Sequence, residues 1–289
     1  MRIAHATDIH WIRMPPWSRM AGKRILGTLN VLRGRGKHFS NRVQRDLVQH
    51  MIELDPDLVI LTGDLTQTAL PSEFEAAKHD LQPLLDTRQV FIVPGNHDVY
   101  TRGARDSDRI SQFFAAWMHR ADAPIGRLDQ GELTVLGLDP CRPGVLSSGL
   151  LPDEQLDALA KVLAEPEMSD RTVILALHYP ILDPRGAVYD NISHGLTNAS
   201  DLIDVLTQAP TRPALIIHGH EHHGFHVMLD DMPIHNSGSS GYGFEPGRRA
   251  AYMNVYDLQD GRVVDVERYM HDGKGWTLEP GGPYNPESP

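Results

Sequence analysis

The sequence predicts an α/β fold, and three observations carry this prediction. Short apolar runs typical of buried strands alternate with segments whose apolar residues recur at helical spacing. Consecutive short strands with Gly-rich turns follow over residues 225–269 and predict some antiparallel sheet. Five of the apolar runs end in Asp, Asn or His, and ligands of open α/β sheets bind beyond the carboxyl ends of the strands. We therefore expect a functional site at that edge.

In the first part of the chain, predicted strands alternate with predicted helices. Residues 2–7, 57–61 and 90–93 are the strands, because each is a short apolar run. Residues 41–53 form a helix, since their apolar side chains recur at helical spacing. A second helix begins at Pro71, with Ser72 as its expected N-cap.

The alternation continues through the second part of the chain. The acidic side chains of Asp153 and Glu154 lie in the first turn of one predicted helix, where they stabilise the helix through attraction to the positive end of its dipole. The predicted helices are 107–119, 152–163 and 199–207, and the predicted strands are 133–139, 171–177 and 214–217.

Composition indicates a globular protein with one domain over residues 1–270. The chain has 289 residues, of which 40% are hydrophobic and 22% are charged, and a Gly/Pro-rich tail is expected over 271–289. The single cysteine, Cys141, excludes an internal disulfide and favours a reducing compartment. No apolar run is long enough for a membrane span, and the N-terminal residues lack the apolar stretch of a signal peptide. We therefore expect a cytoplasmic protein.

The polar residues at the strand ends are of the types that ligate metals. They are Asp8, His10, Asp64, Asn96, His97, Asp98, His178, His220 and His222. Imidazole nitrogens together with carboxylate and amide oxygens suit Zn, Fe, Mn, Co or Ni. One four-coordinate ion cannot use so many ligands, so the set suits two metals that share a carboxylate. A lone His at a strand end is usually structural, but five such ends together predict a metal site.

The spacing of these residues resembles that of the calcineurin-like metallophosphoesterases. The five blocks of that family are D-x-H, G-D, G-N-H-[DE], H and G-H-x-H. They are matched in order by Asp8 with His10, Asp64, residues 95–98, His178 and residues 219–222. The resemblance implies a four-layer α/β/β/α sandwich with two mixed sheets and a dinuclear metal site at the strand C-terminal ends.

The resemblance also implies a role for each matched residue. One metal would be held by Asp8, His10, Asp64 and His222, and the other by Asp64, Asn96, His178 and His220. Manganese, iron and zinc are the expected ions, and the reaction is two-metal hydrolysis of a phosphoester. His97 would stabilise the transition state or protonate the leaving oxygen, with Asp98 holding its ring.

Two histidines outside the blocks carry weaker signals. His5 lies inside the first predicted strand, where a packed core histidine is expected. His194 follows the His178 block in a loop that could line the site.

Residues 11–40 form a basic amphipathic insertion at the expected mouth of the active site. Between Trp11 and Arg45 the chain has nine Lys or Arg and no acidic residue, whereas the remainder has 18 basic and all 38 acidic residues. Four apolar residues fall on one helical face: Ile25, Leu26, Leu29 and Leu32. Bulky apolar residues precede them at Trp11, Met14 and Trp17, and this combination is typical of an interfacial membrane helix. Packing on the domain, a homodimer contact and steering of small phosphates stay open as alternatives.

The sequence predicts the type of reaction but leaves more than one candidate substrate. Residues 23–38 are similar to a segment of bacterial metal-dependent phospholipase C enzymes, so we favour cleavage of phospholipid headgroups, with peripheral contact at the inner membrane face. Residues 63–66 are similar to bacterial cyclic-nucleotide phosphodiesterases, which makes cyclic AMP the alternative substrate. The acidic surface disfavours nucleic acid. A metal-binding scaffold without catalysis is the alternative of another class.

Overall fold

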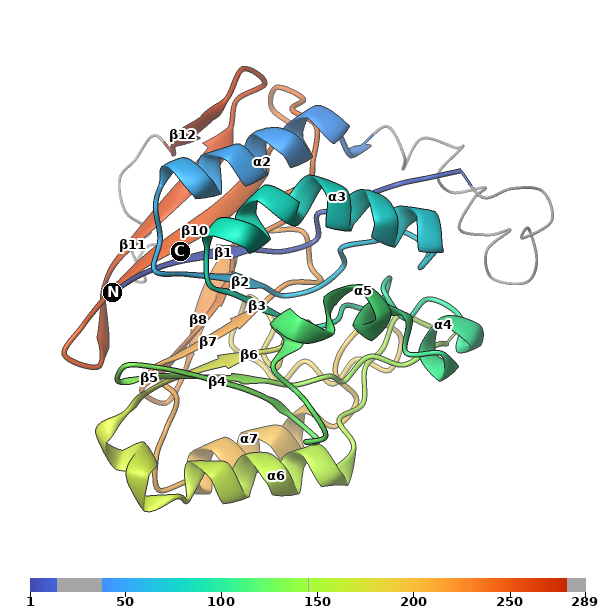
Figure 1. Ribbon diagram of the computed structural model, residues 1–289. Helices are drawn as coiled ribbons and strands as arrows, with labels where there is room; N and C mark the ends of the chain where they lie inside the picture. The colour runs from blue at the N-terminus through green and yellow to red at the C-terminus, as the bar shows by residue number, and fades with distance from the viewer. Residues whose placement is uncertain (15–37, 145, 280–289) are drawn as a thin grey trace.

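The computed structural model describes residues 1–14, 38–144 and 146–279, and in it the chain forms four layers (Figure 1). Helices α2 (Asn41–Glu53) and α3 (Pro71–Thr87) cover one mixed sheet. Helices α6 (Asp153–Leu163) and α7 (Ala199–Gln208) cover a second mixed sheet on the opposite side. The α/β/β/α sandwich with two mixed sheets is therefore confirmed.

Within the described residues, the first sheet has six strands in the order β12-β11-β10-β1-β2-β3. Strands β1, β2 and β3 run parallel, whereas β10, β11 and β12 join them in antiparallel pairs. Their bounds are Arg2–Ala6 for β1, Leu58–Leu61 for β2, Val90–Ile92 for β3, Ala251–Gln259 for β10, Arg262–His271 for β11 and Trp276–Leu278 for β12.

The second sheet, again counted over the described part of the chain, has six strands in the order β4-β5-β6-β7-β9-β8. Strands β5, β6, β7 and β9 are parallel, and β4 and β8 close the edges in antiparallel pairs. Their bounds are Gly126–Gln130 for β4, Leu133–Gly137 for β5, Thr172–Ala176 for β6, Leu215–His218 for β7, Phe225–Leu229 for β8 and Met232–Asn236 for β9.

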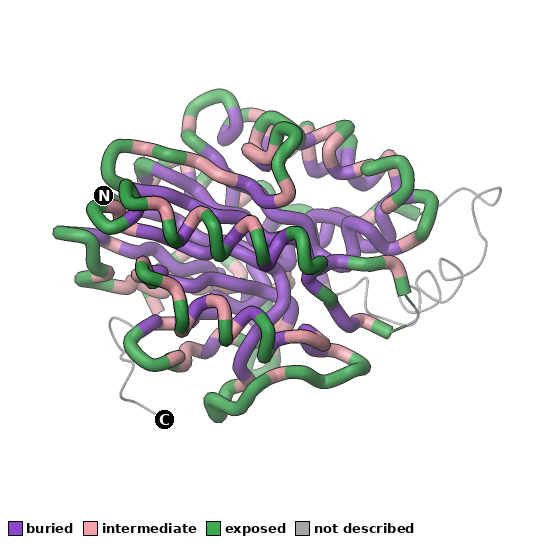
Figure 2. The backbone as a smooth tube through the Cα atoms, turned by 90° about the horizontal axis from the view of Figure 1, so that it is seen from below, coloured by how far each residue is buried: buried purple, intermediate pink, exposed green. Residues whose placement is uncertain are grey.

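Three apolar cores hold the layers together. One lies between the first sheet and helices α2 and α3, a second between the other sheet and helices α6 and α7, and a third between the two sheets. Figure 2 shows this as buried strands in the interior and helices with alternating buried and exposed positions. The parallel strands are buried on both faces, which explains why they are continuous apolar runs in the sequence.

The predicted helix 107–119 is present as α5 (Arg109–Met118). A short helix that the sequence did not predict, α4 (Arg102–Asp106), precedes it, and Asp108 separates the two because its φ of 43° cannot continue a right-handed helix. The predicted cap of the helix that begins at Pro71 needs correction. The N-cap of α3 is Leu70 and not Ser72. The carboxylate of Glu73, in the first turn, reaches back and accepts hydrogen bonds from the backbone N–H groups of Thr68 and Leu70, at 2.9 Å and 3.0 Å, as the Glu of a capping box does.

The expected Gly/Pro-rich tail differs at its start. Residues Trp276–Leu278 pair with β11 and extend the first sheet, and the Trp276 ring stacks on His50 of α2 with the ring centroids 6.0 Å apart. Residues 280–289 of this tail lie outside the described residues.

The basic insertion can be followed only at its two ends, because residues 15–37 lie outside the described residues. Trp11 is fully buried and its indole N–H donates to the carboxylate of Asp80 at 2.9 Å, so it is a core residue and not an interfacial anchor. At the other end, the ring centroid of Phe39 lies 4.5 Å from that of His10. In the ranges 1–14, 38–144 and 146–279, no helix combines the length and apolar character that a membrane span needs.

Two histidines buried between the sheets predict a steep loss of stability in acid. Burial, followed by the proximity of other histidines, lowers the pKa of His5 and of His235 to about 3. In the unfolded chain both rings take up a proton below about pH 6.5, whereas in the folded protein they do so only near their lowered pKa. The free energy of unfolding should therefore fall from pH 6.5 towards pH 3, by up to about 1.4 kcal/mol per pH unit for each ring.

Urea unfolding at several pH values between 7 and 4.5 measures how the free energy of unfolding changes with pH. We expect this slope to be shallower in His235→Phe, because the phenylalanine ring cannot bind a proton. The matched change His79→Phe, at an exposed side chain, should leave the slope as in the original protein. Equal slopes in all three proteins would contradict the prediction.

Candidate metal centre

The candidate ligands follow the carboxyl ends of five strands, and these strands come from both sheets. Asp8 and His10 come after β1, Asp64 after β2 and Asn96 after β3 in the first sheet. The ligand candidates after β6 and β7 in the second sheet are His178, His220 and His222. Because both sheets end at the same edge of the sandwich, these seven side chains meet there.

Five of these residues have a left-handed backbone that non-glycine residues rarely adopt. Their φ values are 51° for Asp8, 55° for His10, 54° for Asp64, 76° for His220 and 56° for His222. Such a conformation costs free energy and persists only where the surrounding structure imposes it, most often at functional sites. Here each left-handed residue turns the chain sharply at or just after a strand end.

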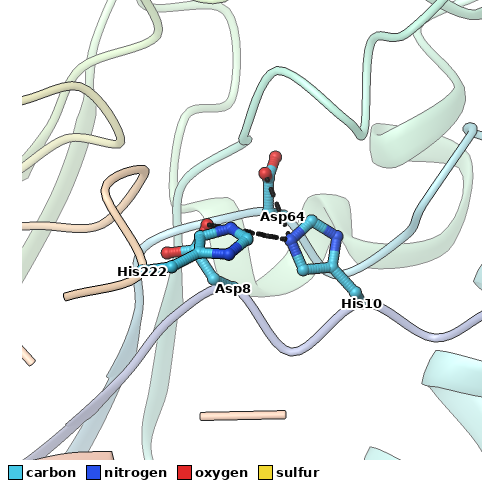
Figure 3. Close-up of side chains that lie close together, drawn as sticks. All are labelled: Asp8, His10, Asp64 and His222. Carbon is cyan, nitrogen blue, oxygen red and sulfur yellow. Dashed lines mark hydrogen bonds and ion pairs between the residues drawn. The ribbon is translucent and has the colours of Figure 1, made fainter. Parts of the chain in front are cut away.

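One group of side chains consists of Asp8, His10, Asp64 and His222, which point toward one another (Figure 3). One potential ligand atom from each lies within 4.8 Å of all the others. The Nε2 atom of His222 is 3.1 Å from Oδ1 of Asp8, and Nε2 of His10 is 3.6 Å from Oδ2 of Asp64.

A second group lies on the other side of Asp64. Oδ1 of Asn96 is 3.1 Å from Nε2 of His178 and 3.0 Å from Nδ1 of His220. Oδ1 of Asp64 is 3.5 Å from the same nitrogen of His178. The two oxygens of Asp64 therefore face the two groups, one oxygen to each.

Backbone carbonyls hold the outer nitrogens of three rings. Nδ1 of His10 lies 3.1 Å from the carbonyl oxygen of Thr66, and Nδ1 of His178 lies 2.7 Å from that of Thr62. Nε2 of His220 lies 2.8 Å from the carbonyl oxygen of His194. A carbonyl oxygen only accepts, so each of these nitrogens donates its proton. In the neutral ring the inner nitrogen then presents a lone pair to the group.

These lone pairs face other acceptors, which is the arrangement that a cation requires. The inner nitrogens of His10 and His222 are 3.3 Å apart, and those of His178 and His220 are also 3.3 Å apart. Oδ1 of Asp8 is buried without a hydrogen-bond donor. Lone pairs that face one another repel unless a proton or a metal ion lies between them, so the donor set fits bound metal.

The charges of the site agree with this fit. Burial lowers the pKa of His10 and of His220 well below the ordinary value, so both rings are neutral at pH 7. Burial alone would raise the pKa of Asp64, but His178 and His97 hold it well below its usual range. Burial would likewise lower the pKa of His178, but Asp64 raises it to about 9. A metal ion at His178 would therefore have to displace a proton.

Two glycines allow this close packing. A Cβ atom at Gly95 would collide with the backbone nitrogen and the carboxylate of Asp64. A Cβ atom at Gly219 would collide with the hydroxyl of Thr7 and the carboxylate of Asp8. At both positions only glycine lets the backbone approach the ligands so closely.

Comparison with protein families identifies the family of the chain. The family model described as calcineurin-like phosphoesterase matches residues 1–224, which is most of the chain. The chain belongs to the calcineurin-like phosphoesterases. It is accordingly a metal-dependent phosphoesterase, a hydrolase whose described residues include Asp/His groups that could hold metal ions.

Relatives of this phosphoesterase carry phosphodiesterase names. A protein of Rhodococcus erythropolis, named as a probable cyclic nucleotide phosphodiesterase, is 33% identical over 221 residues, which are 70% of this chain and 67% of the relative. A 3′,5′-cyclic-nucleotide phosphodiesterase of Nostoc is 26% identical over 69% of each chain. A probable glycerophosphodiester phosphodiesterase of Arcobacter nitrofigilis is 28% identical over 52% of this chain and 54% of its own.

Solved structures show the same fold at low sequence identity. A dimetal phosphatase of Danio rerio superposes with a TM-score of 0.62 and 14% identity, over 96% of this chain and 98% of the other. A purple acid phosphatase of yellow lupin superposes with a TM-score of 0.60 and 13% identity, over 96% of this chain and 52% of the other.

The phosphoesterase holds His97 differently from our expectation. Nδ1 of His97 donates to the carbonyl oxygen of Gln67 at 2.6 Å, and the backbone N–H of His97 donates to Oδ1 of Asp64 at 2.8 Å. The carboxylate of Asp98 instead accepts hydrogen bonds from the backbone of Thr66, at 2.8 Å, and of Gly95, at 3.0 Å. Asp98 therefore joins the loops after β2 and β3 and does not hold the ring of His97.

Sequence reasoning also missed groups that position the ligands. The phenol oxygen of Tyr242 lies 2.6 Å from Nδ1 of His222, and backbone carbonyls orient the other rings. A carbonyl has no signal in the sequence, and Tyr242 lies in a Gly/Ser-rich turn without a motif of its own. The expected contribution of the His194 loop is found, because its carbonyl oxygen contacts His220 and the two rings are 4.2 Å apart.

Removing the hydroxyl of Tyr242 should weaken metal binding without changing a ligand. In Tyr242→Phe, Nδ1 of His222 loses its partner, and such groups typically contribute 10–100-fold in metal affinity, so we expect a loss of roughly that size. Titration of the metal-stripped protein with Mn²⁺ measures the change. Tyr269→Phe, whose hydroxyl donates to Glu267 on β11 and contacts no candidate ligand, is the control. Unchanged affinity in Tyr242→Phe would show that the hydroxyl does not support the site.

Proposed function

We propose that this phosphoesterase is a dinuclear-metal phosphodiesterase and that cyclic nucleotides are its substrates. The observation that carries the metal assignment is Asp64, whose two oxygens face two separate groups of ligand atoms. Asp64 would bridge the ions, with Asp8, His10 and His222 on one side. Asn96, His178 and His220 would complete the second site.

The bound metal ions and His97 would have different roles in the reaction. Two bound divalent ions would supply Lewis-acid stabilisation of the phosphoryl oxygens and lower the pKa of the attacking water. His97 lies beside the site, with its ring centroid 4.9 Å from that of His10 and its Nδ1 proton held by Gln67. In the protonated ring the other nitrogen also carries a proton, which it would deliver to the leaving oxygen or donate to the phosphate. Manganese, iron and zinc suit the mixed nitrogen and oxygen donors.

The choice of substrate rests on the relatives, whose names include cyclic nucleotide phosphodiesterases from two bacteria. Phospholipid headgroups are the substrate that residues 11–40 favour in the sequence, and the Arcobacter relative is named for glycerophosphodiesters. Most of residues 11–40 lie outside the described residues, and Trp11 is buried in the core. Peripheral membrane contact and a homodimer through this segment stay predictions.

A direct comparison of substrates tests the proposal. The Mn²⁺-loaded protein should convert cyclic AMP to AMP with a higher kcat/KM than it shows for glycerophosphocholine or for phosphatidylcholine vesicles. Removal of the metal with EDTA should abolish all three reactions, and added Mn²⁺ should restore them. Faster release of phosphocholine from the vesicles would overturn the choice of substrate, and hydrolysis that survives metal removal would overturn the metal assignment.

A further inference from the structure

A pocket of about 340 Å³ opens beside the metal centre and is not used by the chemistry described above. His222 and Tyr242 line it, and the same two residues belong to the metal centre through the contact between Nδ1 of His222 and the phenol oxygen. The pocket volume falls within the range of small-molecule sites. A phosphodiester at the metals could therefore place its organic part in this pocket.

The wall of the pocket is aromatic. Phe244 and Tyr252 line it together with Tyr242, and Phe244 is 39% exposed. Among residues 1–14, 38–144 and 146–279, no other phenylalanine or tryptophan is classed as exposed. The ring of Phe244 packs against the backbone of Gly273, so closely that a Cβ atom on that glycine would lie only 2.8 Å from Cδ1 of the ring. An aromatic side chain kept in solvent at a pocket wall is typical of a stacking surface.

The rim of the pocket is positively charged. Arg248 and Arg249 both pair with Glu245, at 2.7 Å for the Nη1 atom of Arg248. Two guanidinium groups face one carboxylate, so this group has a net charge of +1. Guanidinium groups donate hydrogen bonds and bind acceptor atoms on the edges of planar rings.

We propose that this pocket binds the base of a nucleotide and so sets the specificity of the phosphodiesterase. This inference rests on the proposed function, because the phosphate must sit at the metals for the base to reach the pocket. The base would stack on Phe244, and its ring nitrogens or carbonyl groups would accept hydrogen bonds from Arg248 or Arg249.

Other organic groups match the pocket less well. Aromatic walls also bind quaternary ammonium groups, but the positive rim would repel the choline of a phosphodiester headgroup. A lipid chain would have to desolvate the same arginines, which is costly for charged groups. The combination of rings and arginines therefore favours a planar group that carries acceptors.

A comparison of two ligands that differ only in the base tests this inference. AMP and ribose 5-phosphate carry the same sugar phosphate, so the ratio of their Kd values for the Mn²⁺-loaded protein isolates the contribution of the base. We expect AMP to bind roughly 10- to 100-fold more tightly, which is the usual scale of stacking. Phe244→Ala should reduce this ratio to about 3 or less, whereas Phe244→Tyr, which keeps a ring, should largely preserve it.

The control variant is Met228→Ala, which removes another exposed apolar side chain on β8 outside the pocket and should leave the ratio unchanged. A ratio near 1 in the original protein, or a ratio that Phe244→Ala does not change, would overturn the inference. Because the measurement is one of binding, it gives an answer even if cyclic AMP is not hydrolysed. Failure of the proposed function would instead appear as absent hydrolysis together with a normal ratio. Tighter binding of glycerophosphocholine than of AMP would show that the pocket selects choline.

Discussion

Asp64→Ala should lose bound metal and lower phosphodiesterase activity by several orders of magnitude. Asp64 has one carboxylate oxygen toward each ligand group, so its removal affects both candidate sites at once. It also removes the acceptor for the backbone N–H of His97, so the loop after β3 loses a contact as well. Elemental analysis of the purified variant and its rate with bis-p-nitrophenyl phosphate measure the two effects.

Asp157→Ala is the matched control, because Asp157 is an exposed acidic residue on α6, the helix that covers the outer face of the second sheet (Figure 1). It should keep the metal content and the rate of the original protein. If Asp64→Ala retained two metals and full activity, Asp64 would not be a bridging ligand and the assignment of both sites would be wrong.

His97→Ala should keep both metals yet react more slowly by roughly 10²–10⁴-fold, the usual scale of general acid–base assistance. The alanine variant retains the backbone N–H that donates to Asp64, so the change is confined to the ring. If the ring protonates the leaving oxygen, the loss should be smaller for an ester of p-nitrophenol than for cyclic AMP. The reason is that p-nitrophenolate leaves without needing a proton.

The same comparison separates the two roles of His97. An equal loss on good and poor leaving groups would favour electrostatic stabilisation of the phosphate over proton donation. A loss of metal in His97→Ala, measured by elemental analysis, would contradict both roles and make His97 a structural support of the ligands.

The clustering of the candidate ligands was predictable because each follows a short apolar strand, and the fold brings the carboxyl ends of those strands together. His178 and Asp64 are 114 positions apart in the sequence, and the sandwich places them 3.5 Å apart. The four layers themselves came from the family resemblance, since the apolar runs alone do not show how the strands divide between two sheets.

The groups that orient the ligands could not be predicted in the same way. The carbonyls of Thr62 and Thr66 are backbone atoms, and they flank the left-handed turn at Asp64, so no residue type in the sequence marks their direction. Trp11 looked like an interfacial residue because it precedes a basic amphipathic segment, but its indole N–H donates to Asp80 on α3. Such pairings are decided by tertiary packing, which a local pattern does not contain.

Titration of the metal-stripped protein with Mn²⁺, while conversion of cyclic AMP to AMP is followed, tests the central claim most directly. The two groups of ligand atoms predict no activity without metal and a rate that rises to a plateau at two equivalents of Mn²⁺ per chain. A plateau at one equivalent, or activity that persists in the metal-stripped protein, would contradict a dinuclear-metal phosphodiesterase.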